Sequence, residues 1–399
     1  MDKAAFFRRA RTDCDGPLEG IRVIDVTTAW AGPMAACLLA DLGCDVIRVD
    51  EPGKGGTHTP QDIPGTGRSF SHETVHRNKR SVSLDLRTAS DVATVLALVA
   101  TADIVVENFK PGTLDGWGVG YEDCRAVKKD IVYVSVSGWG QYGPWSDRPG
   151  YDPIALAASG WMSLNGSSDG PPVKAPTYLG DDLVALHAAL AGLAALNHRN
   201  RTGEGQHVDV SLLDSVLYQS NGLPTLGATG VPLERWGSET GVAVPCATYA
   251  CRDGHVYIAV ALDAHWRRLT EVIGRPDLAN AAGLRTNAER VANRGKANAP
   301  VVEWCRTRTT ADVIAALTAV GIAVAPVNTY AEAVQQAHVR EREVLVDVTL
   351  GNGTTAPLVA PAAKFSRTPT RIRRPAPDTG QHDREILGAL GLKRSAPTE

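Results

Sequence analysis

Short apolar runs that are typical of strands alternate with helical segments through the first half of this 399-residue chain. The run at 21–26 is followed by a helix that Pro33 begins and Gly43 closes, and a second run follows at 45–50. Further strands are predicted at 81–85, 103–107, 131–136 and 206–211. Strands that alternate with helices form parallel sheets, so the predicted fold class is α/β, with a doubly wound, mostly parallel, Rossmann-like sheet.

The second half of the chain carries shorter elements, which predict a smaller α/β unit. In chain order they are a turn at 251–254, a strand at 255–260, helices at 266–273, 287–307 and 310–320, and a strand at 322–327. Residues 218–245 lack clear periodicity and contain scattered Gly and Pro, which is typical of a linker.

The composition is that of an ordinary globular protein, with 21% charged residues and a formal net charge of −3. This balance gives no electrostatic reason to expect a nucleic acid or an anionic membrane as partner. The seven cysteines form no C-x-x-C pair or Cys/His cluster, so we expect reduced thiols and no metal site. No window approaches 18 unbroken apolar residues, and we expect the protein in the cytoplasm.

Polar and aromatic side chains follow several predicted strands at the point where each strand ends. Trp30 follows the first strand, Asn108 and Lys110 follow the strand at 103–107, and Ser137 follows the next one. Ligands of doubly wound sheets bind beyond the carboxyl ends of the strands, so we expect a ligand site at this edge. A nicotinamide dinucleotide is disfavoured, because the first turn has one Gly where the fingerprint needs three.

Two adjacent acids, Asp181 and Asp182, precede an apolar helical run over 183–196. A carboxylate in this place is most often an N-cap, because it can accept hydrogen bonds from the unpaired N–H groups of the first turn. One cap is sufficient, however, and Gly180 would let a ligand approach the backbone closely. A nucleophilic carboxylate is therefore the alternative interpretation.

A series of short motifs recurs in a characteristic order from about residue 16 to residue 387. The most specific are Ala31-Gly32-Pro33, Asn78-Lys79-Arg80-Ser81, Glu107-Asn108-Phe109, Pro149-Gly150-Tyr151-Asp152, Gly180-Asp181 and Arg201-Thr202-Gly203-Glu204-Gly205-Gln206. Together they resemble the class III CoA-transferases, relatives of the formyl-CoA, carnitine and bile-acid CoA-transferases, which share their fold with the α-methylacyl-CoA racemases. The resemblance implies a CoA-transferase that moves CoA from an acyl-CoA donor to a carboxylic acid.

Position by position, the resemblance places the family's nucleophile on Asp181. It implies a mixed anhydride with the donor acyl group and then a covalent aspartyl-CoA thioester, with N–H groups near Gly180 stabilising the oxyanions. Asp182 is then expected to be the helix cap.

The resemblance also implies contacts to CoA from residues at the carboxyl edge of the sheet and before the nucleophile. These are Ala31, Arg87, Asn108, Phe109, Lys110, Tyr151 and Asp152. Phe109 as a core residue and Arg87 as a solvated helix start are the alternatives. Arg77, Lys79 and Arg80 are expected either to reach a phosphate of CoA or to form a basic surface.

Trp30 and Trp139 are expected to line the acyl pocket. Trp30 stands where the formyl-CoA type has a glutamine, so we expect an acceptor acid bulkier than oxalate.

Members of this family are interlocked homodimers, and we expect the same here. The implied domains are the N-terminal part of a large domain at 1–217, a linker at 218–245, a small domain at 246–328, a linker at 329–350 and a tail at 351–399 that returns to the large domain.

Two other functions remain open on the same fold. The first is a 2-methylacyl-CoA racemase or isomerase, which needs a pair of bases. Tyr151 stands where racemases carry a histidine base, and tyrosine is a weak base at neutral pH. The second is a silent CoA-binding subunit of a hetero-oligomer, which the presence of Asp181 disfavours.

Overall fold

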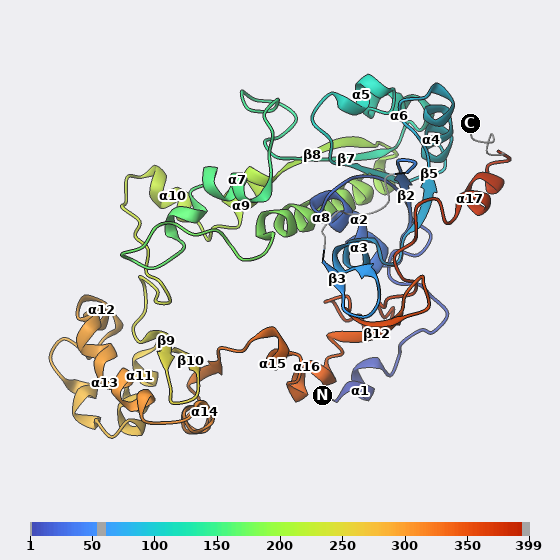
Figure 1. Ribbon diagram of the computed structural model, residues 1–399. Coiled ribbons are helices and arrows are strands. Elements are labelled where there is room, and N and C mark those ends of the chain that lie inside the picture. The colour runs from blue at the N-terminus through green and yellow to red at the C-terminus, as the bar shows by residue number, and fades with distance from the viewer. Residues whose placement is uncertain (1, 54–60, 393–399) are drawn as a thin grey trace. The chain divides into compact units, whose positions relative to one another are not determined.

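The computed structural model describes residues 2–53 and 61–392, which form two compact units (Figure 1). Among these residues, the first unit contains 2–53, 61–161, 174–230 and 338–392, and the second contains 162–173 and 231–337. Each unit therefore combines segments that are distant in the sequence. The domain boundaries expected from the sequence stay a prediction.

The first unit is built on a six-stranded parallel sheet, which confirms the predicted fold class. The strand order is β5-β2-β1-β6-β7-β8, and each neighbouring pair is parallel. The strands are β1 Arg22–Val26, β2 Asp45–Asp50, β5 Arg80–Ser83, β6 Ile104–Glu107, β7 Val132–Ser137 and β8 Gln206–Ser211. The direction of winding reverses between β1 and β6, and doubly wound sheets bind ligands at such a reversal.

Helices cover both faces of this sheet (Figure 1). Successive side chains of a strand point to opposite faces, so Val134 packs with α2 and α8 whereas Tyr133 packs with α4, α6 and α17. The helices of this unit are α1 Lys3–Phe7, α2 Ala31–Asp41, α3 Phe70–His76, α4 Ala89–Val99, α5 Thr113–Trp117, α6 Tyr121–Val127, α7 Asp152–Ala158, α8 Leu179–Thr202, α9 Leu212–Tyr218, α10 Leu223–Ala228 and α17 Asp383–Ala389, with α16 Ala337–Glu341 at its boundary.

Helix α8 is longer than the sequence pattern predicts and begins earlier. It contains 24 residues and starts at Leu179, so Asp181 and Asp182 lie within its first turn and not before it. By length and composition alone α8 could span a membrane, but 44% of its apolar window is buried, where it packs against α2 and β7. This packing accounts for part of its apolar composition, and Leu186 and Leu190 on the same helix are exposed.

The second unit has a three-stranded antiparallel sheet in the order β11-β10-β9. Helices pack on it around the buried rings of Trp266 and Trp304. Its elements are β9 Cys246–Ala250, β10 His255–Ala259, α11 Asp263–Val272, α12 Asn287–Ala292, α13 Arg294–Arg306, α14 Thr310–Ala319, β11 Ala323–Pro326 and α15 Tyr330–Ala333, with short 3₁₀ turns at Trp161–Leu164 and Pro276–Asn280. The helix predicted at 287–307 is divided at Asn293.

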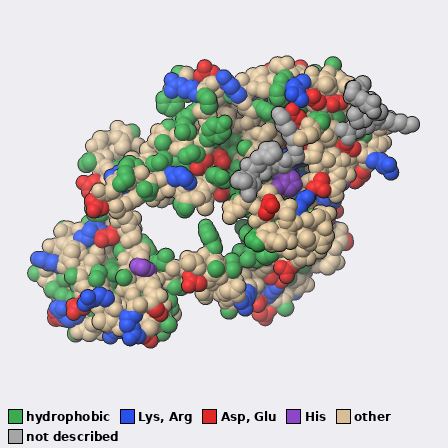
Figure 2. Space-filling view, in the orientation of Figure 1, with side chains coloured by type: hydrophobic (Ala, Val, Ile, Leu, Met, Phe, Trp, Pro, Cys, Tyr) green, Lys and Arg blue, Asp and Glu red, His purple; other side chains and the backbone are tan. Residues whose placement is uncertain are grey.

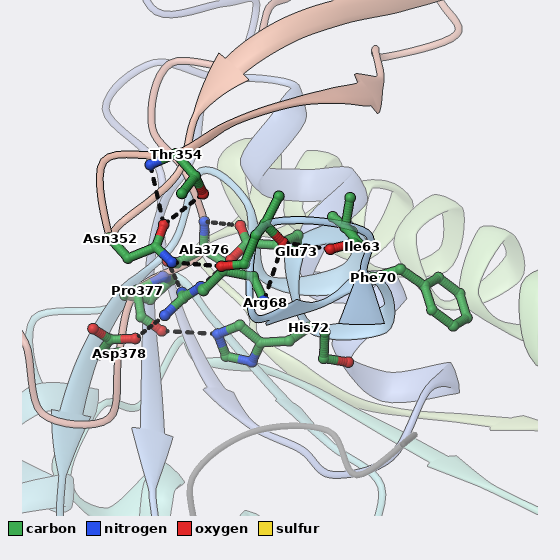
Figure 3. A network of polar contacts seen from close by, with 12 residues as sticks. Ile63, Arg68, Phe70, His72, Glu73, Asn352, Thr354, Ala376, Pro377 and Asp378 are labelled. Atoms are coloured by element: carbon green, nitrogen blue, oxygen red, sulfur yellow. Dashed lines mark hydrogen bonds and ion pairs between the residues drawn. The ribbon is translucent and has the colours of Figure 1, made fainter. Parts of the chain in front are cut away.

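Within the first unit, polar contacts join the C-terminal tail to the segment that contains Arg68 and His72 (Figure 3). The tail contains the hairpin of β12 Leu345–Thr349 and β13 Thr355–Val359, which was not predicted from the sequence. A second hairpin, outside the tail, pairs β3 Asp62–Ile63 with β4 Arg68–Ser69. Arg68 forms ion pairs with Glu73 at 2.7 Å and with Asp378 at 2.5 Å. His72 forms a hydrogen bond with the carbonyl oxygen of Pro377 at 3.0 Å.

The basic run at 77–80 lies inside the first unit, so both expectations for it are wrong. Lys79 is completely buried and pairs with Asp25 at 2.7 Å. The other two cations also pair with acids, Arg77 with Asp41 at 2.7 Å and Arg80 with Asp45 at 2.7 Å. These charges hold elements together, because each is compensated within the fold.

Charges of both signs are interspersed over the visible surface (Figure 2). The chain has 41 Lys and Arg residues against 44 Asp and Glu residues. A mixed surface of this kind does not create the single-sign field that attracts nucleic acids. The expectation of no nucleic-acid partner stays a prediction.

Candidate active site

The loop after β1 is fixed to the loop after β6 where the winding of the sheet reverses. The side-chain amide of Asn108 accepts a hydrogen bond from the Thr28 N–H and donates one to the Thr28 carbonyl oxygen, both at 2.8 Å. Gly32 lies against this contact, because a Cβ there would approach Asn108 Cγ to 2.8 Å. Both ends of the Asn108 amide are thus used to hold the loop, and its contact with CoA stays a prediction.

Trp30 connects this loop to the beginning of α8. The residue immediately precedes α2 and is half-buried. Its Nε1–H donates a hydrogen bond to Asp182 Oδ1 at 2.8 Å, and its ring centroid lies 5.3 Å from that of Tyr178. The indole is therefore fixed between two residues of the α8 N-terminus.

The N-terminus of α8 is capped by a carboxylate from another helix. Asp152, the first residue of α7, is 3% exposed, and its Oδ1 accepts hydrogen bonds from the N–H groups of Gly180 at 2.6 Å and Asp181 at 3.4 Å. The prediction of Asp182 as the cap is wrong, since no side-chain cap is formed there and Asp182 binds Trp30 instead. The Gly180 N–H donates to Asp152, and the oxyanion role expected of the N–H groups near it stays a prediction.

The Asp181 carboxylate lies close to two other carboxylates in a half-buried position. Burial raises its pKa to about 7, and the negative charges of Asp152 and Asp182 act in the same direction. None of the described residues donates a hydrogen bond to its side chain. A carboxylate that lacks such donors is a stronger base and nucleophile than an ordinary aspartate.

Three further residues predicted to contact CoA lie at the surface. Arg87 follows β5 and forms ion pairs with Asp85 at 2.7 Å and Glu51 at 2.9 Å. Lys110 and Tyr151 are exposed, and Tyr151 immediately precedes α7. Their exposure is compatible with ligand binding, and their contacts with CoA stay predictions.

The other predicted contacts are packed against their neighbours. The Phe109 ring lies edge-to-face with Trp117 at 5.2 Å, which supports the alternative of a core residue. Ala31 is 8% exposed at the beginning of α2. Trp139 follows β7, and its Nε1–H donates to the Pro149 carbonyl oxygen at 3.1 Å.

Glu107, the last residue of β6, was missed as a candidate positioning group. It is 5% exposed and accepts a hydrogen bond from the Phe109 N–H at 2.8 Å. Burial raises its pKa to about 7, and the contact with the backbone shapes the turn that carries Asn108. The signal in the sequence was an acid that ends an apolar strand.

No group of three or more His, Cys, Asp or Glu side chains within residues 2–53 and 61–392 is placed to hold a metal ion. The site therefore consists of a poorly solvated carboxylate next to aromatic rings, at the carboxyl edge of a doubly wound sheet.

Comparison with known proteins identifies the family of this chain. The family model for CoA-transferase family III matches residues 18–383. This chain belongs to CoA-transferase family III.

The alignments of this family III member with named relatives cover nearly its whole length. It is 35% identical over 389 residues to a succinate–glutarate CoA-transferase of Agrobacterium fabrum, which covers 94% of this chain and 96% of the relative. It is 36% identical over 379 residues to the β subunit of a succinyl-CoA–L-malate CoA-transferase of Chloroflexus aurantiacus, with 93% of each chain covered.

A solved structure of a CaiB/BaiF family protein from Brucella suis is similar to this chain with a TM-score of 0.83 at 31% identity. The match covers 94% of this chain and 100% of the Brucella chain. The fold and the family are those that the sequence motifs resemble. The chain is thus an enzyme of the CoA-transferase class, with CoA thioesters as substrates.

Proposed function

We propose that this enzyme transfers CoA from an acyl-CoA donor to a carboxylic acid through a covalent aspartyl-CoA thioester on Asp181. The observation that supports this most directly is the half-buried Asp181 carboxylate, whose pKa is raised to about 7 and to which no described residue donates a hydrogen bond. A group in this state is ionised in a large fraction of molecules at neutral pH and is poorly stabilised as an anion. Both properties favour attack on a thioester.

The exchange consists of two similar half-reactions. A carboxylate oxygen of Asp181 attacks the donor carbonyl carbon, and the C–S bond breaks. CoA leaves as a thiolate, and the acyl group stays on Asp181 as a mixed anhydride. The thiolate then attacks the Asp181 carbonyl carbon, and the donor acyl group leaves as a carboxylate when the anhydride C–O bond breaks. The acceptor carboxylate reverses both steps and restores Asp181. No net proton or electron is consumed.

We propose dicarboxylic acids of four or five carbons as substrates, with succinyl-CoA as donor. The relatives are named for succinate with glutarate, L-malate and mesaconate. The half-buried Trp30 at the site agrees with the expectation of an acceptor bulkier than oxalate.

The substrate proposal is tested by exchange from succinyl-CoA into a panel of acids. We expect kcat/KM for glutarate, L-malate or mesaconate to exceed that for oxalate and formate at least about tenfold, the equivalent of one or two contacts in the pocket. The measurement is separation of the acyl-CoA products by chromatography. If oxalate or formate is the best acceptor, the proposed substrate class is wrong.

The pH dependence of the reaction should reflect Asp181. Because the carboxylate attacks only when ionised, kcat/KM for the donor should rise with pH through about 7 and reach a plateau above it. The ionisable groups that shift its pKa are Asp152 on α7 and Asp182 on α8 itself. Asp152→Asn keeps an oxygen for the Gly180 N–H but removes the negative charge that raises the pKa of Asp181. The midpoint of the pH profile of this variant should therefore lie at lower pH than that of the wild type. A flat profile between pH 5 and 8 would contradict the assignment.

We also propose that the active form is a homodimer in the cytoplasm. The resemblance to interlocked family members supports this. Light scattering after size-exclusion chromatography is expected to give twice the mass of one chain, and a monomer that retains full activity would contradict it.

A further inference from the structure

We propose that Asp182 is a positioning residue that fixes the indole of Trp30 beside the Asp181 carboxylate, and that this contact determines which acyl groups the site accepts. The inference rests on the proposed function, since it takes Asp181 as the reacting group. It gives Asp182 a role in place of the helix cap that the sequence predicts.

The start of α8 brings Tyr178, Asp181 and Asp182 close to one another. On an α-helix, residues three and four positions apart lie on one face. Tyr178, immediately before α8, is three positions before Asp181 and four before Asp182, so each acid lies one turn along the helix from it. The proximity of the two acids is also visible in their electrostatics, because the charge of Asp182 contributes to the raised pKa of Asp181.

The indole of Trp30 lies over this face. Its Nε1–H reaches Asp182 Oδ1 at 2.8 Å and its ring packs against Tyr178 at 5.3 Å, four positions earlier on the same face. The indole thus contacts the residue one position after Asp181 and the residue three positions before it, which brings the ring to the helical turn that carries this carboxylate.

The backbone of Trp30 is held from the opposite side of the loop. Asn108 fixes Thr28 through two hydrogen bonds of 2.8 Å, and α2 begins directly after Trp30. The remaining freedom is rotation of the Trp30 side chain. The hydrogen bond to Asp182 removes that freedom, because a hydrogen bond to a carboxylate is shorter and stronger than one between neutral groups.

A fixed ring beside the reacting carboxylate limits the size and shape of the acyl group that can approach it. Without the hydrogen bond, the ring can rotate away from α8 and leave space for bulkier acids. Asp182 thus acts on substrate choice through Trp30 and does not need to touch the substrate.

Three variants separate the contact from the charge. Asp182→Ala removes both the acceptor and the charge, Asp182→Asn keeps an acceptor oxygen, and Trp30→Phe keeps a ring but removes the donor. Each is assayed with succinyl-CoA as donor and with glutarate and 3,3-dimethylglutarate as acceptors, so that the ratio of the two kcat/KM values reports pocket shape. The ¹H–¹⁵N spectrum of the indole Nε1–H, assigned by its loss in Trp30→Phe, reports the hydrogen bond without any need for activity.

We expect Asp182→Ala and Trp30→Phe each to lower the glutarate preference at least about fivefold, the size of effect that one hydrogen bond supports. Asp182→Asn should keep the preference within about twofold of the wild type, since an amide oxygen still accepts the bond. In Asp182→Ala the indole resonance should shift and its hydrogen should exchange faster.

An unchanged preference in Asp182→Ala, with the indole resonance shifted, would overturn the inference and leave the CoA-transferase mechanism intact. An unchanged indole resonance would overturn it as well, because the contact would then be absent in solution. A preference that Asp182→Asn loses as fully as Asp182→Ala would show that the charge of Asp182 matters and not the hydrogen bond, which also contradicts the inference. Failure of Asp181 to form an adduct in the wild type would instead contradict the proposed function.

Discussion

Replacement of Asp181 by asparagine is expected to lower kcat for CoA exchange by a factor on the order of 1,000 or more, as losses of covalent nucleophiles do in other enzymes. The amide has nearly the same shape as the carboxylate, but its oxygen is a poor nucleophile and cannot form the anhydride. The measurement is the rate of exchange between succinyl-CoA and glutarate. The matched control is Glu122→Gln, an acid-to-amide change at an exposed position on α6, which should retain full activity.

The same variant should be no less stable than the wild type, which distinguishes a catalytic loss from misfolding. Burial raises the pKa of Asp181 to about 7, so the native state binds its proton more tightly than the unfolded chain does. Above pH 7 the ionised carboxylate opposes folding, and Asp181→Asn should gain stability on the order of 2 kcal/mol there. That gain should shrink as the pH falls from about 7 and disappear below about 4, where the wild-type carboxyl is protonated in both states. An inactive variant that is also strongly destabilised at pH 8 would contradict this explanation.

The largest expected effect on stability is at Lys79. Its Nζ lies 2.7 Å from Asp25 Oδ2 and 2.8 Å from the Pro33 carbonyl oxygen, and both charged side chains are completely buried. Lys79→Met leaves a buried carboxylate without its cation, which should lower the free energy of unfolding by about 3–5 kcal/mol. Chemical denaturation followed by circular dichroism measures this change.

The control for Lys79→Met is a cation of an exposed pair. Arg125 lies 3.3 Å from Glu122 on the surface of α6, with more than half of each side chain accessible. Arg125→Met should change stability by no more than about 0.5 kcal/mol, because water screens such pairs. If Lys79→Met costs no more than Arg125→Met, the buried pair does not stabilise the fold in the way described here.

The sheet could be predicted from the sequence because its signal is local. The runs that end at Val26, Asp50 and Ser211 are apolar or alternate regularly, and one helix with clear boundaries, α2, separates the first two. Helices between successive strands require parallel pairing, and the carboxyl edge of the sheet follows from that pairing. The position of the candidate site at this edge could therefore be inferred before the structure was known.

The details of the site depended on contacts between distant residues and could not be predicted in this way. The cap of α8 comes from Asp152, 28 positions before Gly180, and it replaces the local cap expected from Asp182. Lys79 has the sequence context of a surface cation, but its partner Asp25 lies 54 positions away. In both cases a buried charge found its partner through the tertiary fold, which a local pattern does not specify.

The covalent role of Asp181 is tested most directly by a peptide mass map of the enzyme incubated with succinyl-CoA and no acceptor, followed by treatment with hydroxylamine. We expect a CoA adduct on the peptide that contains Asp181, and hydroxylamine should convert this adduct to a hydroxamate. Neither product should form in Asp181→Asn. An unmodified Asp181 peptide in an enzyme that still exchanges CoA would contradict the covalent mechanism.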